Sequence, residues 1–395
     1  MSTKIYRPKR MKFGAFLAPF HRADENPTIA IERDLEYIEQ MDRFNFDEVW
    51  IGEHHSAGWE IIASPELVMV AAAQRTRSIK VGTGVLSLPY HNPLIVADRF
   101  VQLDHMTRGR AMLGVGPGAL TSDAYMMGID PLEQRRMMDE SLEAILALLR
   151  GEIVNMETDW FTLRDARLQL ASYTYPHLPV AVAAAFSPAG PITAGKHGVG
   201  ILSNALNHPD GQQSLERTWD WASEAAAESG KTISREDWRV VLPFHLAESK
   251  KEAIQDIREM FRHEAEDYFG ATIGRGPAPG EGSLEAAIER GSIIVGTPDD
   301  AIPIIEHVLE ISGGFGGMLT RPGEYTTWDK TVHSLELWSR YVMPRFQGQI
   351  APKEASVDWV SSNPAAKVNT DAVTKAFEDA GKNIPGNVDE SQRPR

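Results

Sequence analysis

Short apolar segments of strand character alternate with helix-like segments through the first 115 residues of the chain. Strands are predicted at residues 12–17, 49–51, 80–86 and 111–115, and helices at residues 29–41, 66–75 and 94–106. The helical segments place apolar residues on one face, as at Ile31, Leu35 and Ile38. Because parallel strands are joined by crossover connections that are usually helices, this alternation predicts a parallel sheet.

The same alternation continues to about residue 341. Further strands are predicted at residues 178–184, 199–203, 238–245 and 315–319, and helices at 131–150, 212–228, 250–268 and 329–341, with one more helix ending near residue 197. Residues 153–170 have the alternating and aromatic character of a hairpin outside the main sheet. Eight strands without a dividing linker predict a single α/β domain over residues 1–350, a (β/α)8 TIM barrel.

Two segments lie outside this plan. Residues 270–291 contain six glycines and two prolines, which predicts an irregular insertion before the last strand and, from its length, a lid over the active site. Residues 351–395 are polar and contain few large apolar residues, so we expect an extended or disordered C-terminal tail.

Composition restricts the class of function. The net charge of −15 argues against nucleic acid as a partner, since phosphates would be repelled. The absence of cysteine excludes disulfides, thiolate catalysis and thiolate metal sites. The sequence contains neither an apolar run of about 18 residues nor a signal-peptide pattern, so we expect no membrane partner and a cytoplasmic location.

The second predicted strand ends in an unusual group of residues. The apolar run Val49–Ile51 is followed by Gly52, Glu53, His54 and His55. At a strand end in a parallel barrel, such a group indicates chemistry, although structural histidines that only bond to nearby backbone are also common. Adjacent His54 and His55 would point to opposite faces of an extended chain, and no metal-ligand spacing is apparent, so no metal site is predicted.

Polar and small residues follow the other predicted strands as well. They are His21, Tyr90, His91, Gly116, Phe186, Ser187, Asn204 and His245. The loop at Ser187 has small residues and opens a helix, which suits a phosphate site, although Ser-Pro is also an ordinary helix start. The carboxyl ends of parallel strands meet at one rim, so we expect these side chains to gather around one site.

Several motifs resemble the bacterial luciferase superfamily of flavin-dependent monooxygenases. The resemblance is carried by MKFGAFL, VWIGEHHSAGWEIIASP, IKVGTGVLSLPYHNP, DRFVQLDHMTRGRAMLGVGPG and LPVAVAAAFS. It runs from about residue 11 to residue 346 and implies a TIM barrel. It also implies reduced FMN as a co-substrate, a separate flavin reductase, and a dimer or higher homo-oligomer.

Site residues can be transferred from this resemblance position by position. His54 matches the family's catalytic histidine. Thr83, Gly84 and Val85 match the strand end that supports the flavin ring, often with a non-proline cis peptide, and Ser187 matches a serine that bonds the FMN phosphate. The chain departs from luciferases at two positions, because Pro117 replaces an arginine that binds the phosphate and Phe186 replaces an acidic residue.

The remaining predicted site residues complete the set. Gly116 is assigned to the cofactor, and substrate contacts are assigned to His21, Tyr90, His91, Phe186, Asn204 and His245. We therefore expect an FMN-dependent monooxygenase that inserts one atom of O2 into a small apolar organic substrate, such as a monoterpene, ketone or aldehyde, through a flavin hydroperoxide. Two alternatives remain open at this point: a deazaflavin-dependent oxidoreductase of the same superfamily, and a non-catalytic flavin-binding barrel.

Replacing the predicted phosphate ligand tests the cofactor assignment. Ser187→Ala should weaken FMN binding by roughly 1–3 kcal/mol, because a charge-assisted hydrogen bond to the phosphate is lost. Titration of the enzyme with FMN measures this directly. An unchanged dissociation constant would mean that the phosphate lies elsewhere.

Overall fold

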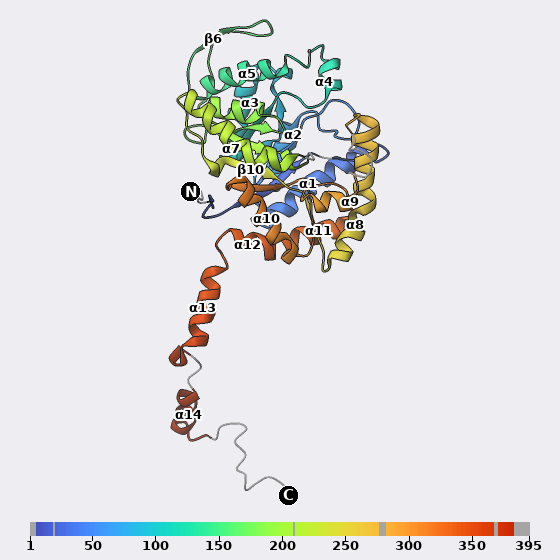
Figure 1. The fold of residues 1–395 in the computed structure, drawn as a ribbon. Coiled ribbons are helices and arrows are strands. Elements are labelled where there is room, and N and C mark those ends of the chain that lie inside the picture. Colours follow the sequence, from blue (N-terminus) through green and yellow to red (C-terminus); the bar gives the residue numbers. More distant parts are fainter. Residues whose placement is uncertain (1–4, 19, 208–209, 276–281, 367–369, 383–395) are drawn as a thin grey trace. The chain divides into compact units, whose positions relative to one another are not determined.

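Eight parallel strands, one of them in two pieces, form a closed barrel surrounded by helices (Figure 1). The computed structural model describes residues 5–18, 20–207, 210–275, 282–366 and 370–382. The barrel strands are β1 (Lys12–Leu17), β2 (Glu48–Ile51), β3 (Lys80–Thr83) with β4 (Leu86–Ser87), β5 (Ala111–Gly116), β8 (Val180–Ala184), β9 (Gly200–Ser203), β10 (Trp238–Val241) and β13 (Gly317–Thr320). The barrel closes because β3 pairs with both β2 and β5, and β1 with both β2 and β13. The predicted TIM barrel is confirmed.

Helices connect successive strands and begin largely where capping residues predict. They are α1 (Pro27–Arg43), α2 (Pro65–Arg75), α3 (Pro93–Thr107), α5 (Gln134–Leu149), α6 (Ala189–His197), α7 (Gly211–Glu228), α10 (Pro298–Ser312), α11 (Trp328–Leu337), the π-helix η5 (Trp338–Val342) and α12 (Met343–Phe346). Asn26 and Asn92 cap α1 and α3 by accepting hydrogen bonds from first-turn amides. Within the described residues, no helix combines the length and apolar character needed to cross a membrane.

The predicted third and seventh strands are each divided. The third stops at Thr83 and resumes at Leu86, and the peptide bond between Gly84 and Val85 is cis. The seventh stops at Val241, because Pro243 has no N–H to continue the ladder. The residues that follow, β11 (Phe244–Leu246), leave the barrel and pair with β12 (Ile294–Gly296).

The excursion between β5 and β8 contains one more helix than expected. A short helix, α4 (Thr121–Met126), precedes α5, which begins at Gln134 rather than at residue 131. The predicted hairpin is confirmed as β6 (Val154–Glu157) and β7 (Thr162–Ala166), which pair antiparallel.

The predicted irregular insertion is more ordered than its glycine content indicates. Helix α8 (Lys250–His263) continues as a π-helix, η4 (Glu264–Thr272), and the helix α9 (Leu284–Glu289) begins where Ser283 caps its N-terminus. The expectation of irregular structure over residues 270–291 is therefore wrong for α9, and residues 276–281 lie outside the described residues. Its function as a lid stays a prediction.

The described part of the C-terminal segment contains two helices. The chain divides into two compact units, Met1–Gln347 and Gly348–Arg395. In the second unit, α13 (Ala351–Ser362) and α14 (Thr370–Asp379) contradict the expected extended tail. Alanine, lysine and glutamate favour helix even where no core is available, and a proline in the first turn of α13 suits a helix start.

An inner layer of apolar side chains fills the middle of the barrel. It consists of Trp50, Met112, Ala181, Leu202, Val241 and Leu319. Toward the amino ends of the strands, a buried ion pair follows this layer. Arg239 Nε donates to Glu48 Oε1 at 2.5 Å and Nη2 donates to Oε2 at 3.2 Å, while Trp50 Nε1 donates to Oε1 at 3.0 Å.

This pair holds the ionised form of Glu48 inside the protein. Burial by itself raises the pKa of Glu48, but Arg239 and Trp50 outweigh it and lower that pKa. Both side chains are almost fully buried, so neither charge has water as an alternative partner.

Removing one member of the pair should destabilise the barrel strongly. We expect Glu48→Ala to reduce the free energy of unfolding by about 3–5 kcal/mol, because Arg239 would remain buried and unpaired. Chemical denaturation measures the loss. Glu32→Gln is the matched control, since Glu32 pairs with Arg75 at 2.6 Å on the surface, and it should change stability much less. Equal losses for the two variants would contradict the assignment.

Candidate functional site

Buried ionisable side chains surround His54 at the carboxyl ends of the strands. His54 follows β2, and its Nδ1 lies 3.1 Å from Oδ2 of Asp123, which is on α4. Its Nε2 lies 3.5 Å from Oε2 of Glu60, in the segment between β2 and α2. The three side chains are 14%, 1% and 7% exposed, respectively. Each ring nitrogen of His54 therefore faces a carboxylate, and the two carboxylates come from different segments.

These neighbours decide the protonation of His54. Burial by itself lowers the pKa of His54, but the charges of Glu60 and Asp123 and the hydrogen bond to Asp123 raise that pKa above 6.5. Burial raises the pKa of Asp123, but the hydrogen bonds from His54 and Ser56 outweigh it and lower that pKa. For Glu60, burial dominates and raises the pKa. The site therefore stabilises the protonated form of His54 more than water does.

His55 belongs to a second cluster, centred on Glu53. Its Nε2 lies 3.1 Å from Glu53 Oε1, and His91 Nε2 lies 2.6 Å from the same oxygen. The amide of Ser87 donates to Glu53 Oε2 at 2.5 Å. Tyr90 stands edge-on to the His55 ring, with the ring centres 5.8 Å apart. The adjacent histidines thus serve different clusters, as expected for an extended chain.

The divided third strand brings the predicted cofactor residues together. Thr83 Oγ1 donates to Gly114 O at 2.7 Å and accepts from Gly114 N at 3.1 Å, which ties β3 to β5. Val85 then packs against Gly116, where an added Cβ would come within 2.5 Å of Val85 Cγ2. Because Gly116 has no side chain, Val85 and the Gly84–Val85 peptide can lie close to β5.

The predicted residues after β8 and β9 lie at neighbouring strand ends. Ser187 is half-buried just before α6, and Phe186 is 43% exposed. Ser214 Oγ donates to the Phe186 carbonyl at 2.8 Å, and the Asn204 amide donates to Ala184 O at 2.8 Å. Since β8 pairs with β9, these residues share one sector of the rim.

Two predicted histidines contact other elements. His245 lies on β11, outside the barrel, and its Nε2 is 3.3 Å from Oδ2 of Asp256 on α8. Its predicted position at the end of a barrel strand is therefore wrong, because the chain leaves the barrel at Pro243. His21 follows β1 as predicted, but its ring faces Asp34 of α1 at 3.0 Å and Glu324 at 3.6 Å.

The structure adds site residues that the sequence analysis missed. Asp123 and Glu60 are two, and Tyr268 of η4 is a third, since its hydroxyl donates to Glu60 Oε1 at 2.9 Å. Asp123 could have been found, because it lies just beyond the end of the fourth strand. Tyr268 carries no such signal, since it is 208 positions from Glu60 in the chain.

An aromatic cluster surrounds the Tyr268–Glu60 contact. The rings of Phe20, Trp59 and Phe269 lie 4.9, 5.7 and 5.0 Å from that of Tyr268. Phe20 also pairs with Glu60 through an isolated antiparallel bridge. The carboxylate next to His54 is therefore bordered by large apolar rings.

A buried ion pair fixes η4 to the end of β13. Arg321 Nη1 lies 2.7 Å from Glu264 Oε1, and Nη2 donates to the Tyr325 hydroxyl at 2.9 Å. That hydroxyl donates to Glu264 Oε2 at 2.5 Å. The Arg321 guanidinium also lies 4.9 Å from the centre of the Phe20 ring. The aromatic cluster is thereby held against the barrel rim.

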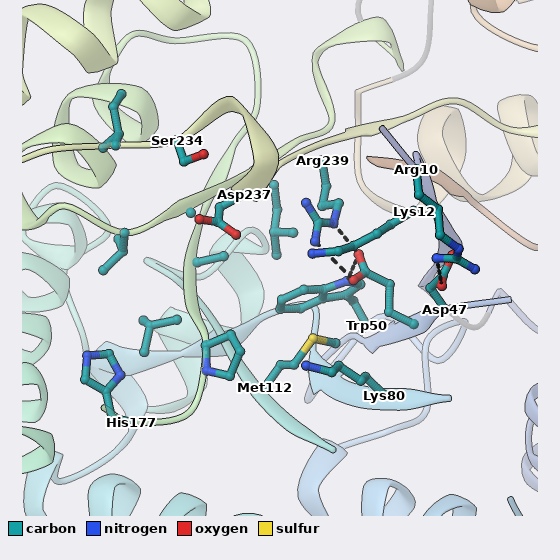
Figure 2. Close-up of a pocket in the computed structure, with 18 of the residues that line it drawn as sticks. Arg10, Lys12, Asp47, Trp50, Lys80, Met112, His177, Ser234, Asp237 and Arg239 are labelled. Carbon is teal, nitrogen blue, oxygen red and sulfur yellow. Dashed lines mark hydrogen bonds and ion pairs between the residues drawn. The ribbon is translucent and has the colours of Figure 1, made fainter. Parts of the chain in front are cut away.

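A cavity of about 740 Å³ opens at the opposite end of the barrel (Figure 2). Its lining includes Arg239, Glu48, Arg10 and Asp47. Arg239 pairs with Glu48, and Arg10 pairs with Asp47, so these charges compensate each other. Conserved function in such barrels belongs to the carboxyl ends of the strands, whereas the amino ends contribute stability. We therefore place the candidate active site at His54 and not in this cavity.

Comparison with known proteins agrees with this geometry. Residues 11–313 match the family of luciferase-like monooxygenases. The chain belongs to this family.

Two relatives that cover most of the chain are monooxygenases. The chain is 47% identical to limonene 1,2-monooxygenase of Rhodococcus erythropolis, over 87% of this chain and 89% of the relative. It is 44% identical to 4-hydroxyprotoasukamycin monooxygenase of Streptomyces nodosus subsp. asukaensis, over 91% and 98%.

A solved structure shares the fold. It is the oxygenating constituent of 3,6-diketocamphane monooxygenase of Pseudomonas putida in complex with FMN, with a TM-score of 0.71 and 26% identity over 85% of this chain and 98% of that one. This luciferase-like protein is accordingly a flavin-dependent monooxygenase, which confirms the family, fold and reaction class predicted from the sequence.

The electrostatics of His54 can be tested by titration. Asp123→Asn should lower the pKa of His54, because the variant removes a negative charge and a strong acceptor. The histidine ring resonances followed by NMR against pH report this, with the His54 signal identified by its absence in His54→Ala. Asp139→Asn is the control, because Asp139 Oδ1 lies 2.8 Å from Nε2 of a different histidine, His197. This variant should leave the pKa of His54 unchanged.

The same pKa shift has a consequence for stability. The folded protein holds the His54 proton more tightly than the unfolded chain, so this group stabilises the fold fully below pH 6.5 and loses that contribution as pH rises through the folded pKa. An unshifted His54 titration in Asp123→Asn would contradict the assigned role of Asp123.

Proposed function

We propose that this protein is the oxygenating component of a two-component system. It would take reduced FMN from a separate flavin reductase and insert one oxygen atom of O2 into a small apolar organic substrate, with a monoterpene or related ketone or aldehyde as the favoured class. The observation that carries the proposal is the placement of a buried His54 between Asp123 and Glu60, beside the divided third strand. The identity to a limonene monooxygenase supports the substrate class.

The rim residues fit a flavin. Val85, which packs against Gly116, offers an apolar surface for a planar ring. The half-buried Ser187 precedes α6, whose first-turn amides can bind a phosphate. Thr83 and Gly84 would support the ring through the backbone. Reduced FMN, when bound, supplies the electrons that activate O2.

The protein's own part is positioning, proton supply and exclusion of water. Asp123 fixes the orientation of the His54 ring and stabilises its protonated form, so that His54 can donate a proton to an oxygen atom at the rim. The rings of Phe20, Trp59, Tyr268 and Phe269 provide an apolar wall, which favours a hydrocarbon-like substrate and a dry site. Tyr90, His91, Phe186 and Asn204 line other sectors of the same rim in this proposal.

An isotope experiment tests the reaction. The enzyme, FMN, a flavin reductase with its nicotinamide donor, and limonene are incubated under 18O2, and the product is analysed by mass spectrometry. We expect one labelled oxygen atom per product molecule. Turnover that requires a reduced deazaflavin and proceeds without O2 would refute the proposal.

His54→Ala examines the mechanism in the same assay. We expect product formation to fall on the order of a hundredfold or more, with FMN affinity within about tenfold of the native value, because His54 acts at the reacting atoms and not on the phosphate. His333→Ala, in an exposed pair with Glu248, is the control and should keep native activity. Native product yield from His54→Ala would remove this residue from the mechanism.

A further inference from the structure

A third cluster of ionisable side chains at the rim, around His21, is separate from the clusters of His54 and Glu53. His21 is 4% exposed, and its Nε2 lies 3.0 Å from Oδ2 of the buried Asp34. Its Nδ1 is buried without a hydrogen bond and faces Glu324 Oε1 at 3.6 Å. Oε2 of Glu25 is also buried without a hydrogen bond. Two buried atoms without a hydrogen bond thus belong to one cluster of the described residues.

This arrangement is typical of a metal-binding histidine. Such a histidine donates its second ring N–H to a carboxylate, which fixes the tautomer and leaves the other nitrogen free to bind the ion. With the proton on Nε2, Asp34 accepts it, and the Nδ1 lone pair faces the two glutamates. One ligand atom each from His21, Glu25 and Glu324 lies within 4.8 Å of the others.

The charges of the cluster also favour a cation. Glu25 and Glu324 lie close together, since their ligand oxygens are within 4.8 Å of each other. Two carboxylates that face each other are costly when both are ionised. A divalent cation between them would remove this repulsion and satisfy the unpaired nitrogen and oxygen atoms.

We propose that His21, Glu25 and Glu324 form a binding site for a divalent transition-metal ion of the Zn2+ type. One imidazole nitrogen with two carboxylate oxygens suits Zn2+, whereas Ca2+ and Mg2+ prefer oxygen ligands alone. The spacing of residues along the chain predicts no metal site, because Glu324 lies about 300 positions from the other two ligands and only the fold brings them together.

Such an ion would connect two segments of the active-site rim. His21 and Glu25 follow β1, and Glu324 follows β13. Phe20 of the aromatic cluster precedes His21, and Arg321, which binds Glu264, precedes Glu324. The ion would therefore act as a structural cross-link beside the aromatic wall and would stabilise the folded protein by mass action.

Calorimetric titration of the chelator-treated full chain with Zn2+ alone tests the proposal. We expect one site per chain, at least tenfold weaker in Glu25→Gln and in Glu324→Gln, and no comparable binding of Ca2+. Glu248→Gln is the matched control, because Glu248 lies 3.1 Å from His333 in an exposed histidine–glutamate pair, and it should leave the site intact.

Two further measurements keep the test independent of variant folding. Zn2+ should raise the melting temperature of the native protein, and Co2+ in its place should give the visible absorption of nitrogen and oxygen coordination. Lack of one-to-one binding by the native protein would overturn the proposal and leave a proton on His21 as the group that holds the cluster together. Binding that survives both glutamine substitutions would overturn it equally.

Discussion

The closure of the barrel between β3 and β5 is the constraint on which the site depends. At this junction Thr83 Oγ1 bonds both backbone groups of Gly114, and a Cβ on Gly114 would come within 2.0 Å of Thr83 O. Only glycine allows the strands to approach this closely. Because the closed strands are all parallel, their carboxyl ends form one rim, and His54, Val85 and Ser187 follow three separate strands at that rim.

The cost of burying charge explains both ends of the barrel. Glu48 and Arg239 satisfy each other at the amino ends, and because arginine does not lose its proton, that pair is a structural one. His54 at the opposite end has partners that can themselves be protonated. Glu60 and Asp123 raise its pKa against the effect of burial. The cost of burial is thus met by a fixed ion pair at one end and by partners that shift the pKa of a histidine at the other.

The π-helix η4 links the reactive cluster to the segment that precedes the predicted lid. Tyr268 binds Glu60, and Glu264, one turn earlier, binds Arg321 at the end of β13. π-Helical turns are energetically unfavourable and occur frequently at functional sites. Here the π-helix presents Glu264 to Arg321 and Tyr268 to Glu60, which are held by different strand ends.

Local patterns in the sequence predicted the order of strands and helices. They also predicted that α6 ends at a glycine and that β2 is followed by a group of polar residues. The capping box of α10, Thr297 with Asp300, is equally local, but the sequence patterns considered above predict neither β12 nor α10. Family motifs predicted His54 and Ser187 as site residues. Tertiary structure alone decided the partners of His54.

Asp123 is 69 positions from His54, Tyr268 is 208 from Glu60, and β11 pairs with β12 across an excursion that the sequence presents as irregular. Backbone hydrogen bonding and amphipathic spacing act within a few residues and can be read from the chain. The electrostatic partners of a buried imidazole depend on which segments pack together, and that depends on the whole barrel.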